Sequence, residues 1–196
     1  MLLACTVFIL ISCGRVRRLG PGEYAQWMQE KDNGLLRERM VSGYRFTAKL
    51  EPADWLALKE YKSELTGERL DSLKNIYSNT VHITIEAGSD DGKSPLLRAH
   101  LDNTRQYFER MHYYTSLVQE DLVLVEGSDT LHCAFYHFEQ SFDLLPVNSL
   151  IMEFERKRTG EFKDLLLIYN DRMLNTGPIK FHFPAGELNT VPQLVI

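Results

Sequence analysis

The chain has 196 residues, of which 44% are apolar and 25% charged, and its formal net charge is -5 at pH 7. This length and composition suit one folded domain with a substantial core and exclude a disordered stalk. The mild acidity excludes an extended basic face for nucleic acid, because binding phosphates requires clustered lysine and arginine.

An uncharged apolar run from Leu2 to Ile11 opens the chain. A run of about a dozen residues is too short to cross a hydrocarbon core of roughly 30 Å, but it suits the apolar region of a signal peptide. The run closes in Leu-Ile-Ser-Cys, which resembles the lipobox of bacterial lipoproteins. The resemblance implies that residues 1–12 are a signal peptide and that Cys13 carries the lipid, including palmitate. There are two alternatives for this run: it is an ordinary buried segment, or it directs secretion with cleavage by another peptidase.

Arg15, Arg17 and Arg18 follow the expected lipid anchor directly. Each would gain about 1 kcal/mol beside an anionic membrane surface, so we expect them to contact that surface; the alternative is a solvated tether. Gly20-Pro21-Gly22 ends this segment. The sequence therefore predicts a tether over residues 13–22 and a single α+β domain over 23–196.

The three cysteines have different expected fates. Cys5 would leave with the signal peptide, Cys13 would carry the lipid, and Cys133 would remain alone. The mature protein would then have no internal disulfide although it is exported. Its stability must come from the hydrophobic core.

Apolar residues recur at three- and four-residue spacing in the first half of the chain, which predicts amphipathic helices. The expected helices cover Glu23–Lys31, the segment from Pro52 to Leu65, Thr66–Tyr77, and Asp102–Val118, with Asp102 as the N-cap.

Alternating apolar and polar residues, and at 121–126 a continuous apolar run typical of a central strand covered on both faces, predict strands, mostly in the second half of the chain. The expected strands are Leu35–Val41 and Tyr44–Leu50, split by Ser42-Gly43, then Thr80–Ala87, Asp121–Glu126, Thr130–Gln140, Ser149–Arg156, Phe162–Tyr169 and Ile179–Phe183. Strands separated by tight turns favour an antiparallel β-sandwich or partly open barrel, with several N-terminal helices packed on it.

One cluster of reactive side chains lies in the expected strand 130–140. Cys133 stands between His132 and His137, which suggests a thiol nucleophile or a metal site. Strand alternation places Cys133, Phe135 and His137 on one face and His132 on the other, so the two histidines meet only if the strand is bulged. A small buried hydrophobe is therefore the favoured interpretation of Cys133.

Two further candidates have simpler interpretations. His100 and Asp102 stand two residues apart at a helix start, where capping by Asp102 explains the carboxylate. The polar loop 88–95 carries Asp90 and Asp91 but lacks the closing bidentate glutamate of a calcium loop. The familiar nucleotide, zinc-protease and hydrolase signatures are missing from the sequence, so we expect no metal and no cofactor.

The mature chain also resembles the envelope lipoproteins of Bacteroidota as a group. The resemblance rests on Ile-Ser-Cys, on Glu-Tyr-Ala-Gln-Trp at 23–27, on Asn33-Gly34-Leu35, on the extended segment 44–50 before Pro52, and on Phe138-Glu139 with Pro146. It implies an outer-membrane location but transfers no catalytic residue. Surface-exported members often carry acidic residues after the lipidated cysteine, so the arginines here favour the periplasmic face.

These observations together predict a lipid-anchored envelope protein, and they favour a binding module over an enzyme. It would act as a non-catalytic accessory subunit of an outer-membrane assembly, with the membrane and an envelope protein as partners. The alternatives are a hydrolase or transferase that uses Cys133, His137 or the His100/Asp102 pair, and a carrier with a small-ligand cavity between its sheets.

Overall fold

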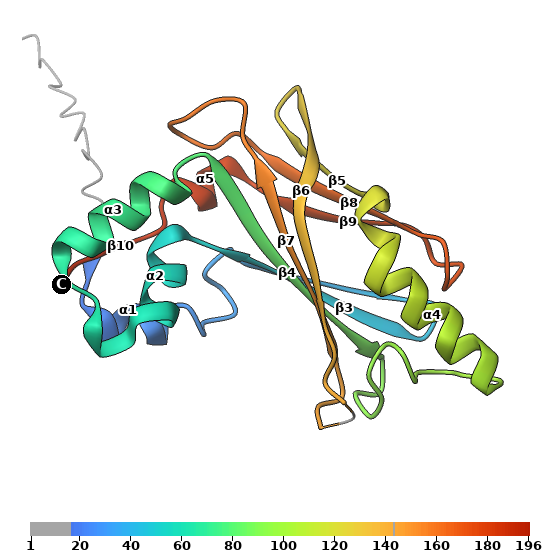
Figure 1. Ribbon diagram of the computed structural model, residues 1–196. Coiled ribbons are helices and arrows are strands. Elements are labelled where there is room, and N and C mark those ends of the chain that lie inside the picture. Colours follow the sequence, from blue (N-terminus) through green and yellow to red (C-terminus); the bar gives the residue numbers. More distant parts are fainter. Residues whose placement is uncertain (1–16, 143) are drawn as a thin grey trace, which may run out of the picture.

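An eight-stranded antiparallel sheet forms the body of the protein (Figure 1), as seen in a computed structural model that describes residues 17–142 and 144–196. The strand order is β2-β3-β4-β7-β6-β5-β8-β9. The strands are β2 (Leu36–Val41), β3 (Tyr44–Glu51), β4 (Thr80–Ser89), β5 (Leu122–Glu126), β6 (Asp129–Glu139), β7 (Asn148–Glu155), β8 (Leu165–Asp171) and β9 (Gly177–Phe183). The expected α+β class with a partly open antiparallel barrel is confirmed.

Short elements complete the fold. Two-residue strands β1 (Arg18–Leu19) and β10 (Gln193–Leu194) pair in parallel. The helices are α1 (Pro21–Trp27), α2 (Ala53–Tyr61), α3 (Gly67–Tyr77), α4 (Thr104–Ser116) and α5 (Ala185–Leu188), with 3₁₀ turns η1 (Lys62–Glu64) and η2 (Val118–Asp121). Among the described residues, the first strand begins at Arg18, within the segment 13–22 that is expected to be a tether, and Leu19 is buried.

The β2–β3 hairpin shows how the sequence produces the sheet. Ser42 and Gly43 both have positive φ, 51° and 81°, as a two-residue turn that matches strand twist requires. Along β3, Tyr44, Phe46, Ala48 and Leu50 are buried, while the alternate residues are only half-buried. The predicted alternation is therefore confirmed, with one face of the strand inside the barrel.

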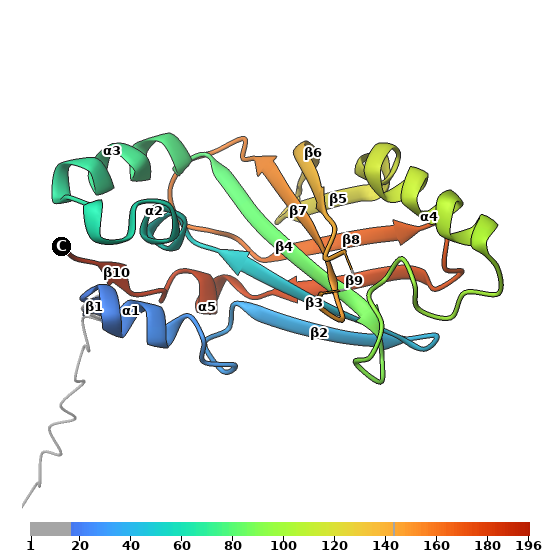
Figure 2. The ribbon, with the colours of Figure 1, turned by 60° about the horizontal axis from the view of Figure 1, so that its bottom comes forward.

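Arginine side chains bridge the last gap in the barrel, between edge strands β2 and β9. Arg37 Nε donates to the carbonyl of His182 at 2.7 Å, and Arg39 Nε donates to the carbonyl of Lys180 at 3.1 Å. Arg37 also pairs with Glu187 and lies over the ring of Phe183. The two edges therefore share side-chain hydrogen bonds in place of a backbone ladder, and the barrel is nearly closed (Figure 2).

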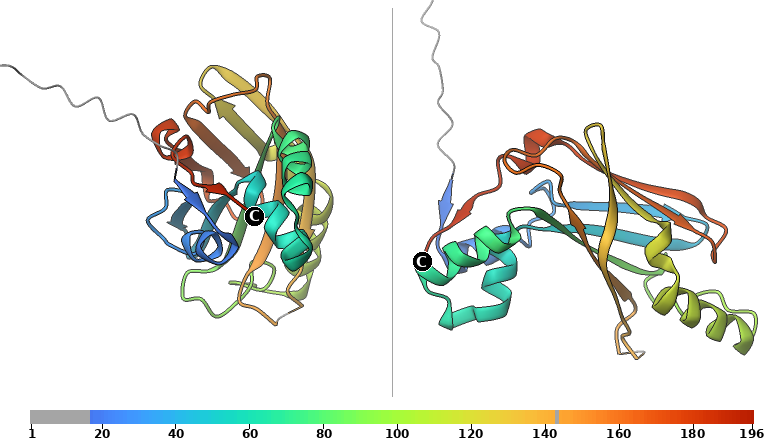
Figure 3. Two further views of the ribbon diagram at one scale, coloured as in Figure 1. Left: turned by 90° about the vertical axis from the view of Figure 1, so that its left-hand side faces the viewer. Right: turned by 45° about the horizontal axis from the view of Figure 1, so that its top comes forward.

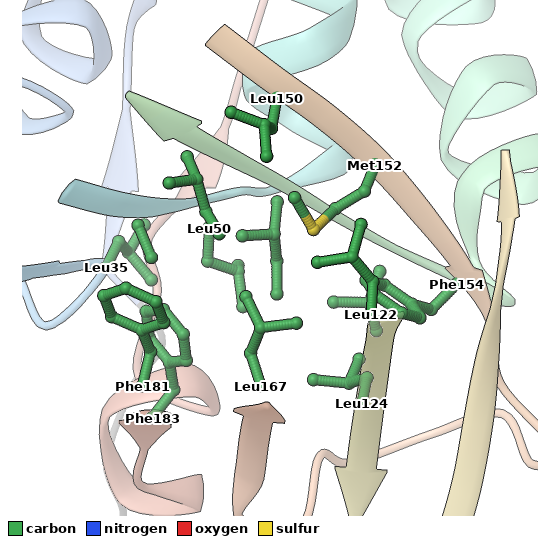
Figure 4. Packing of buried hydrophobic residues seen from close by; sticks show 14 of the residues in the cluster. Leu35, Leu50, Leu122, Leu124, Leu150, Met152, Phe154, Leu167, Phe181 and Phe183 are labelled. Atoms are coloured by element: carbon green, nitrogen blue, oxygen red, sulfur yellow. The ribbon is translucent and has the colours of Figure 1, made fainter. Parts of the chain in front are cut away.

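The barrel interior is filled with side chains. Figure 4 shows leucine, methionine and phenylalanine side chains from opposite walls pointing toward one another. The labelled residues are Leu35, Leu50, Leu122, Leu124, Leu150, Met152, Phe154, Leu167, Phe181 and Phe183, each at most 4% exposed. Burial of this apolar surface is the main stabilising contribution to the fold.

Helices cover the two ends of the barrel (Figures 1 and 3). The α2 end carries α1, α2, α3, α5 and both chain ends of the described structure. The α4 end carries α4, the β2–β3 turn and the loops that join β4 to α4, β6 to β7 and β8 to β9. The expectation that helices pack on the sheet is met mainly at its ends.

Candidate functional site

The expected membrane-proximal residues fall partly outside the described structure. Cys13 and Arg15 lie outside the described residues, as does the expected signal peptide 1–12. Arg17 and Arg18 are exposed at the α2 end, where the carbonyl of Arg17 accepts the backbone N–H of Gln193 at 2.9 Å. Within the described part of the chain, no helix is long and apolar enough to cross a membrane.

A β-bulge changes the expected arrangement around Cys133. The register of β6 against β7 shifts between Cys133 and Phe135, so alternation reverses there. Cys133 is buried, whereas Phe135 is 54% exposed and His137 is exposed on the outer face. The expectation that Cys133, Phe135 and His137 share one face is therefore wrong.

The thiol of Cys133 has the surroundings of a buried hydrophobe. Its Sγ donates to the carbonyl of Phe135 at 3.0 Å, and burial raises its pKa to about 11. A nucleophilic cysteine needs the opposite shift, because the thiolate is the reactive form. The bulge does place His132 and His137 on the same exposed face, but it separates both from Cys133.

The His100/Asp102 pair is not assembled as a site. His100 Nε2 lies 2.8 Å from the carbonyl of Gly43, and its ring meets Tyr44 edge-on. Asp102 instead accepts from the side chain of Gln106 at 2.9 Å. The N-cap of α4 is Asn103, which accepts from Gln106 N, so the expected capping by Asp102 is off by one residue.

The richest polar arrangement next to a cavity lies at the start of β4. Thr80 and His82 alternate with buried Val81 and Ile83, so both side chains turn away from the barrel interior. Thr80 Oγ1 donates to the carbonyl of Tyr77 at 3.1 Å and lies 2.8 Å from His82 Nε2. With the hydroxyl proton directed at Tyr77, Nε2–H of His82 is the donor of the second hydrogen bond.

Neighbouring charges face His82 from three elements. Its Nδ1 lies 3.9 Å from Glu153 Oε2 on β7, and Glu51 on β3 binds Lys59 of α2 at 2.6 Å. Burial lowers the pKa of His82, against the opposing effect of the two glutamates, and thus favours the neutral imidazole. Thr80, His82 and Glu153 resemble a hydroxyl, imidazole and carboxylate relay in outline. However, the hydroxyl proton points away from the imidazole and the carboxylate is beyond hydrogen-bond reach, so Thr80 is not activated.

His82 separates two hollows of the surface. A cavity of about 320 Å³ lies under the α3–β4 junction and α5, between Leu50, Val81, Phe162 and Leu188. A shallower groove of about 410 Å³ lies on the outer face of the sheet against α2 and α3, and includes Phe135. We name these the inner cavity and the outer groove. Tyr77 and His82 contribute to both.

Arg156, one of the residues that line the inner cavity, belongs to a buried ion pair. Arg156, which follows β7, binds both carboxylate oxygens of Glu126 on β5, with Nη2 to Oε1 at 2.6 Å. The side chains are only 3% and 8% exposed. The guanidinium also donates to the carbonyls of Gly160 and Glu161 and lies 4.0 Å from the centre of the Phe162 ring. Its charge is therefore fully engaged within the protein.

The loop between β6 and β7 exposes apolar side chains at the α4 end. Phe142, Leu144 and Leu145 are 80%, 85% and 59% exposed. Phe142 shares a small surface pocket with Tyr107 of α4, and the Tyr107 ring meets that of Phe108, which is 64% exposed. We name Phe108, Phe142, Leu144 and Leu145 the apolar tip. Because clustered exposed apolar residues mark interaction sites, the apolar tip is a candidate contact surface.

The sequence alone did not single out the polar arrangement at His82 beside the inner cavity, nor the apolar tip. Thr80 and His82 were recognisable as sharing a strand face, but the proximity of Glu153, Tyr77 and the inner cavity depends on the tertiary fold. Among the described residues, no group of three or more His, Cys, Asp or Glu side chains is arranged to hold a metal ion.

Comparisons with known proteins provide little beyond this geometry. No protein-family model matches the chain, and no curated protein matches it in sequence. Among solved structures, the chain is similar to a DUF4426 family protein from Pseudomonas aeruginosa PAO1, with 3% identity and a TM-score of 0.37. The match covers 76% of this chain and 91% of the other.

Proposed function

We propose that this protein is a lipid-anchored, non-catalytic binding subunit of an outer-membrane assembly, held by Cys13 and contacting a protein partner through the apolar tip. The observation that carries the proposal is the exposure of Phe142, Leu144 and Leu145 in the β6–β7 loop. Figure 1 shows this loop projecting from the barrel away from α1, β10 and the other elements of the α2 end. An anchor at one end leaves the other free to meet a partner.

The anchor part of the proposal rests on the sequence and on the position of the first described residues. The lipobox-like Leu-Ile-Ser-Cys supplies the lipidation site. Arg17 and Arg18 are exposed at the α2 end, and in the sequence they follow the expected anchor Cys13 by four and five residues, with Arg15 in between. Basic side chains in this position favour the anionic surface of a membrane, and we place the protein on the periplasmic face.

The partner part of the proposal rests on the chemistry of the apolar tip. Large apolar side chains at the centre of an interface carry most of its binding energy. The tip combines phenylalanines and leucines from two elements, α4 and the β6–β7 loop. A protein partner with a complementary apolar pocket would bury them, and the polar residues around the tip would form the rim.

Intact mass spectrometry and affinity capture test the two parts separately. The mature protein should carry acyl mass at its new N-terminus, and Cys13→Ser should abolish both the acyl mass and sedimentation with membranes. From detergent-solubilised envelopes, the parent should capture one stoichiometric membrane protein, and Phe142→Ser/Leu144→Ser should lose it. The control Ile76→Ser, at an apolar position on α3 that is 64% exposed, should retain it. Equal capture by both variants would refute the assignment to the apolar tip.

A further inference from the structure

We infer that the inner cavity binds a small, uncharged molecule with an apolar body and one hydroxyl group. This inference concerns the α2 end and a small ligand, so it stands independently of the protein partner proposed for the apolar tip. It rests on the size and lining of the cavity, on the hydrogen bonds already made inside it, and on the state of its charged groups.

The cavity has the size and lining of a ligand site. Its volume of about 320 Å³ lies at the lower limit of natural small-molecule pockets, which span roughly 300–1,000 Å³. Apolar side chains from four parts of the chain form most of its wall, namely Leu50, Tyr77, Val81, Phe162, Leu188 and Val191. A ligand of a few apolar groups would bury its surface against them.

Two hydroxyl groups, of Ser78 and Thr80, belong to residues that line the cavity, and both donate to backbone carbonyls, so each can only accept from a ligand. Thr80 Oγ1 donates a hydrogen bond to the Tyr77 carbonyl at 3.1 Å and lies 2.8 Å from His82 Nε2. A hydroxyl oxygen has two lone pairs, so one remains after the bond from His82. A ligand that donates a proton, such as an alcohol, satisfies this lone pair, whereas an ether does not.

The charged groups at the cavity leave no counter-ion for an ionic ligand. Arg156 is bound to both oxygens of Glu126, and Glu51 is bound to Lys59 at 2.6 Å and to Thr84 at 3.1 Å. Burial lowers the pKa of His82 and favours its neutral form. A carboxylate or an ammonium in the cavity would lose its hydration without gaining a free partner of opposite charge. The free energy of this desolvation would exceed the favourable free energy of its apolar contacts. The ligand is therefore neutral.

Three amphiphiles with the same chain test this inference: 1-octanol, octanoate and octylammonium, titrated into the protein at neutral pH while backbone amide NMR shifts are recorded. We expect 1-octanol to give saturable shifts at Val81 and Val191. The two ions should bind at least about tenfold more weakly, a difference of about 1.4 kcal/mol. Tighter binding of either ion, or non-saturable shifts with the alcohol, would overturn the inference.

Matched variants place the ligand in the cavity. Ala53 and Ala185 each open a helix directly after a proline and are half-buried, but only Ala53 lines the cavity. Ala53→Phe should abolish the octanol shifts, and Ala185→Phe should retain them. The parent should prefer 1-octanol to its methyl ether about fivefold to tenfold, as one hydrogen bond predicts, and Thr80→Val should remove this preference. A preference that survives in Thr80→Val would exclude Thr80 as the acceptor.

Discussion

The two ends of the barrel close by different chemistry. At the α4 end, the hydroxyls of Tyr114 and Tyr169 donate to Asp171 Oδ2 at 2.7 and 2.5 Å, and Asp171 Oδ1 accepts the backbone N–H groups of Met173 and Leu174. Burial, with the nearby Asp171 charge, raises the pKa of both tyrosines well above its usual value. The hydroxyls therefore remain protonated donors, and the buried carboxylate is satisfied on both oxygens.

At the α2 end, a buried ion pair stands beside an open cavity. Arg156 and Glu126 satisfy each other, while His82 and Thr80 are among the polar residues that line the inner cavity, together with Glu51, Ser78 and Arg156 itself. Both ends thus bury polar groups, but the tyrosine network at the α4 end fills its space with rings. The ion pair at the α2 end is fully hydrogen-bonded and still lies beside a cavity, so satisfying buried polar groups does not by itself fill the volume around them.

Removing one member of the ion pair should have the largest effect on stability. Glu126→Ala leaves the Arg156 charge buried without its partner, and we expect the free energy of unfolding to fall by about 3–5 kcal/mol. Urea denaturation measures the loss. The double change Glu126→Leu/Arg156→Met should recover most of it, because the desolvated charges are then both gone. A loss below about 1 kcal/mol for Glu126→Ala would mean that the pair behaves as a solvated surface ion pair.

At the α4 end, the tyrosine hydroxyls allow a matched comparison. Tyr169→Phe removes a hydrogen bond to the Asp171 carboxylate and should cost about 1.5–3 kcal/mol. Tyr24 is also fully buried, but its hydroxyl has no hydrogen-bond partner within residues 17–142 and 144–196. Tyr24→Phe should therefore leave stability unchanged or raise it. The comparison is measured by urea denaturation of both variants, and equal losses would contradict the importance of the Asp171 network.

Cys133 lies in the sheet between the two ends and should behave as a packing residue. Cys133→Ser replaces the buried sulfur by a smaller hydroxyl that can still donate to the Phe135 carbonyl, so we expect a loss of about 1 kcal/mol. Partner capture from solubilised envelopes should be unchanged. If Cys133→Ser lost partner capture while its stability was unchanged, Cys133 would have a functional role.

The smallest expected effect is on the pH dependence of stability, through His82 at the α2 end. The pKa of His82 is lowered in the folded protein, so the unfolded chain binds the proton more readily. Stability should therefore fall as pH decreases below about 6.5, the pKa of an unperturbed histidine, and level off below the folded pKa. His82→Gln should remove this part of the slope, measured from urea midpoints between pH 7.5 and 5.5. An unchanged slope would show that Glu51 and Glu153 compensate the burial of His82.

Much of the fold could be predicted because it depends on local patterns. Alternation, together with the continuous apolar run at 121–126, located eight of the strands, and the hairpin turn at Ser42-Gly43 was visible in the sequence. The boundaries were less accurate: the strand expected from Phe162 begins at Leu165, because Phe162 packs on Arg156. The two-residue strands β1 and β10 form only by pairing with each other, so no local sequence pattern predicts them.

The candidate sites were harder to predict for a physical reason. The bulge at Cys133 adds one residue without any special residue type, and it reverses the faces of everything after it in β6. The inner cavity joins residues from β3, β4, α5 and the β7–β8 loop, whose proximity is set by the barrel. Three residues of the apolar tip stand close together in the sequence, in Phe-Asp-Leu-Leu at 142–145, but their exposure could not be predicted from it.

Photocrosslinking in intact envelopes tests the central claim, that the α4 end meets a protein partner, most directly. A photoreactive phenylalanine analogue is placed at Phe142 in the apolar tip, and the control carries it at Ile76 on α3, which is 64% exposed at the α2 end. We expect one discrete protein adduct from position 142, absent from position 76 and absent when Leu144→Ser is added. Adducts of equal yield from both positions, or adducts to lipid alone from position 142, would contradict the proposed binding role of the apolar tip.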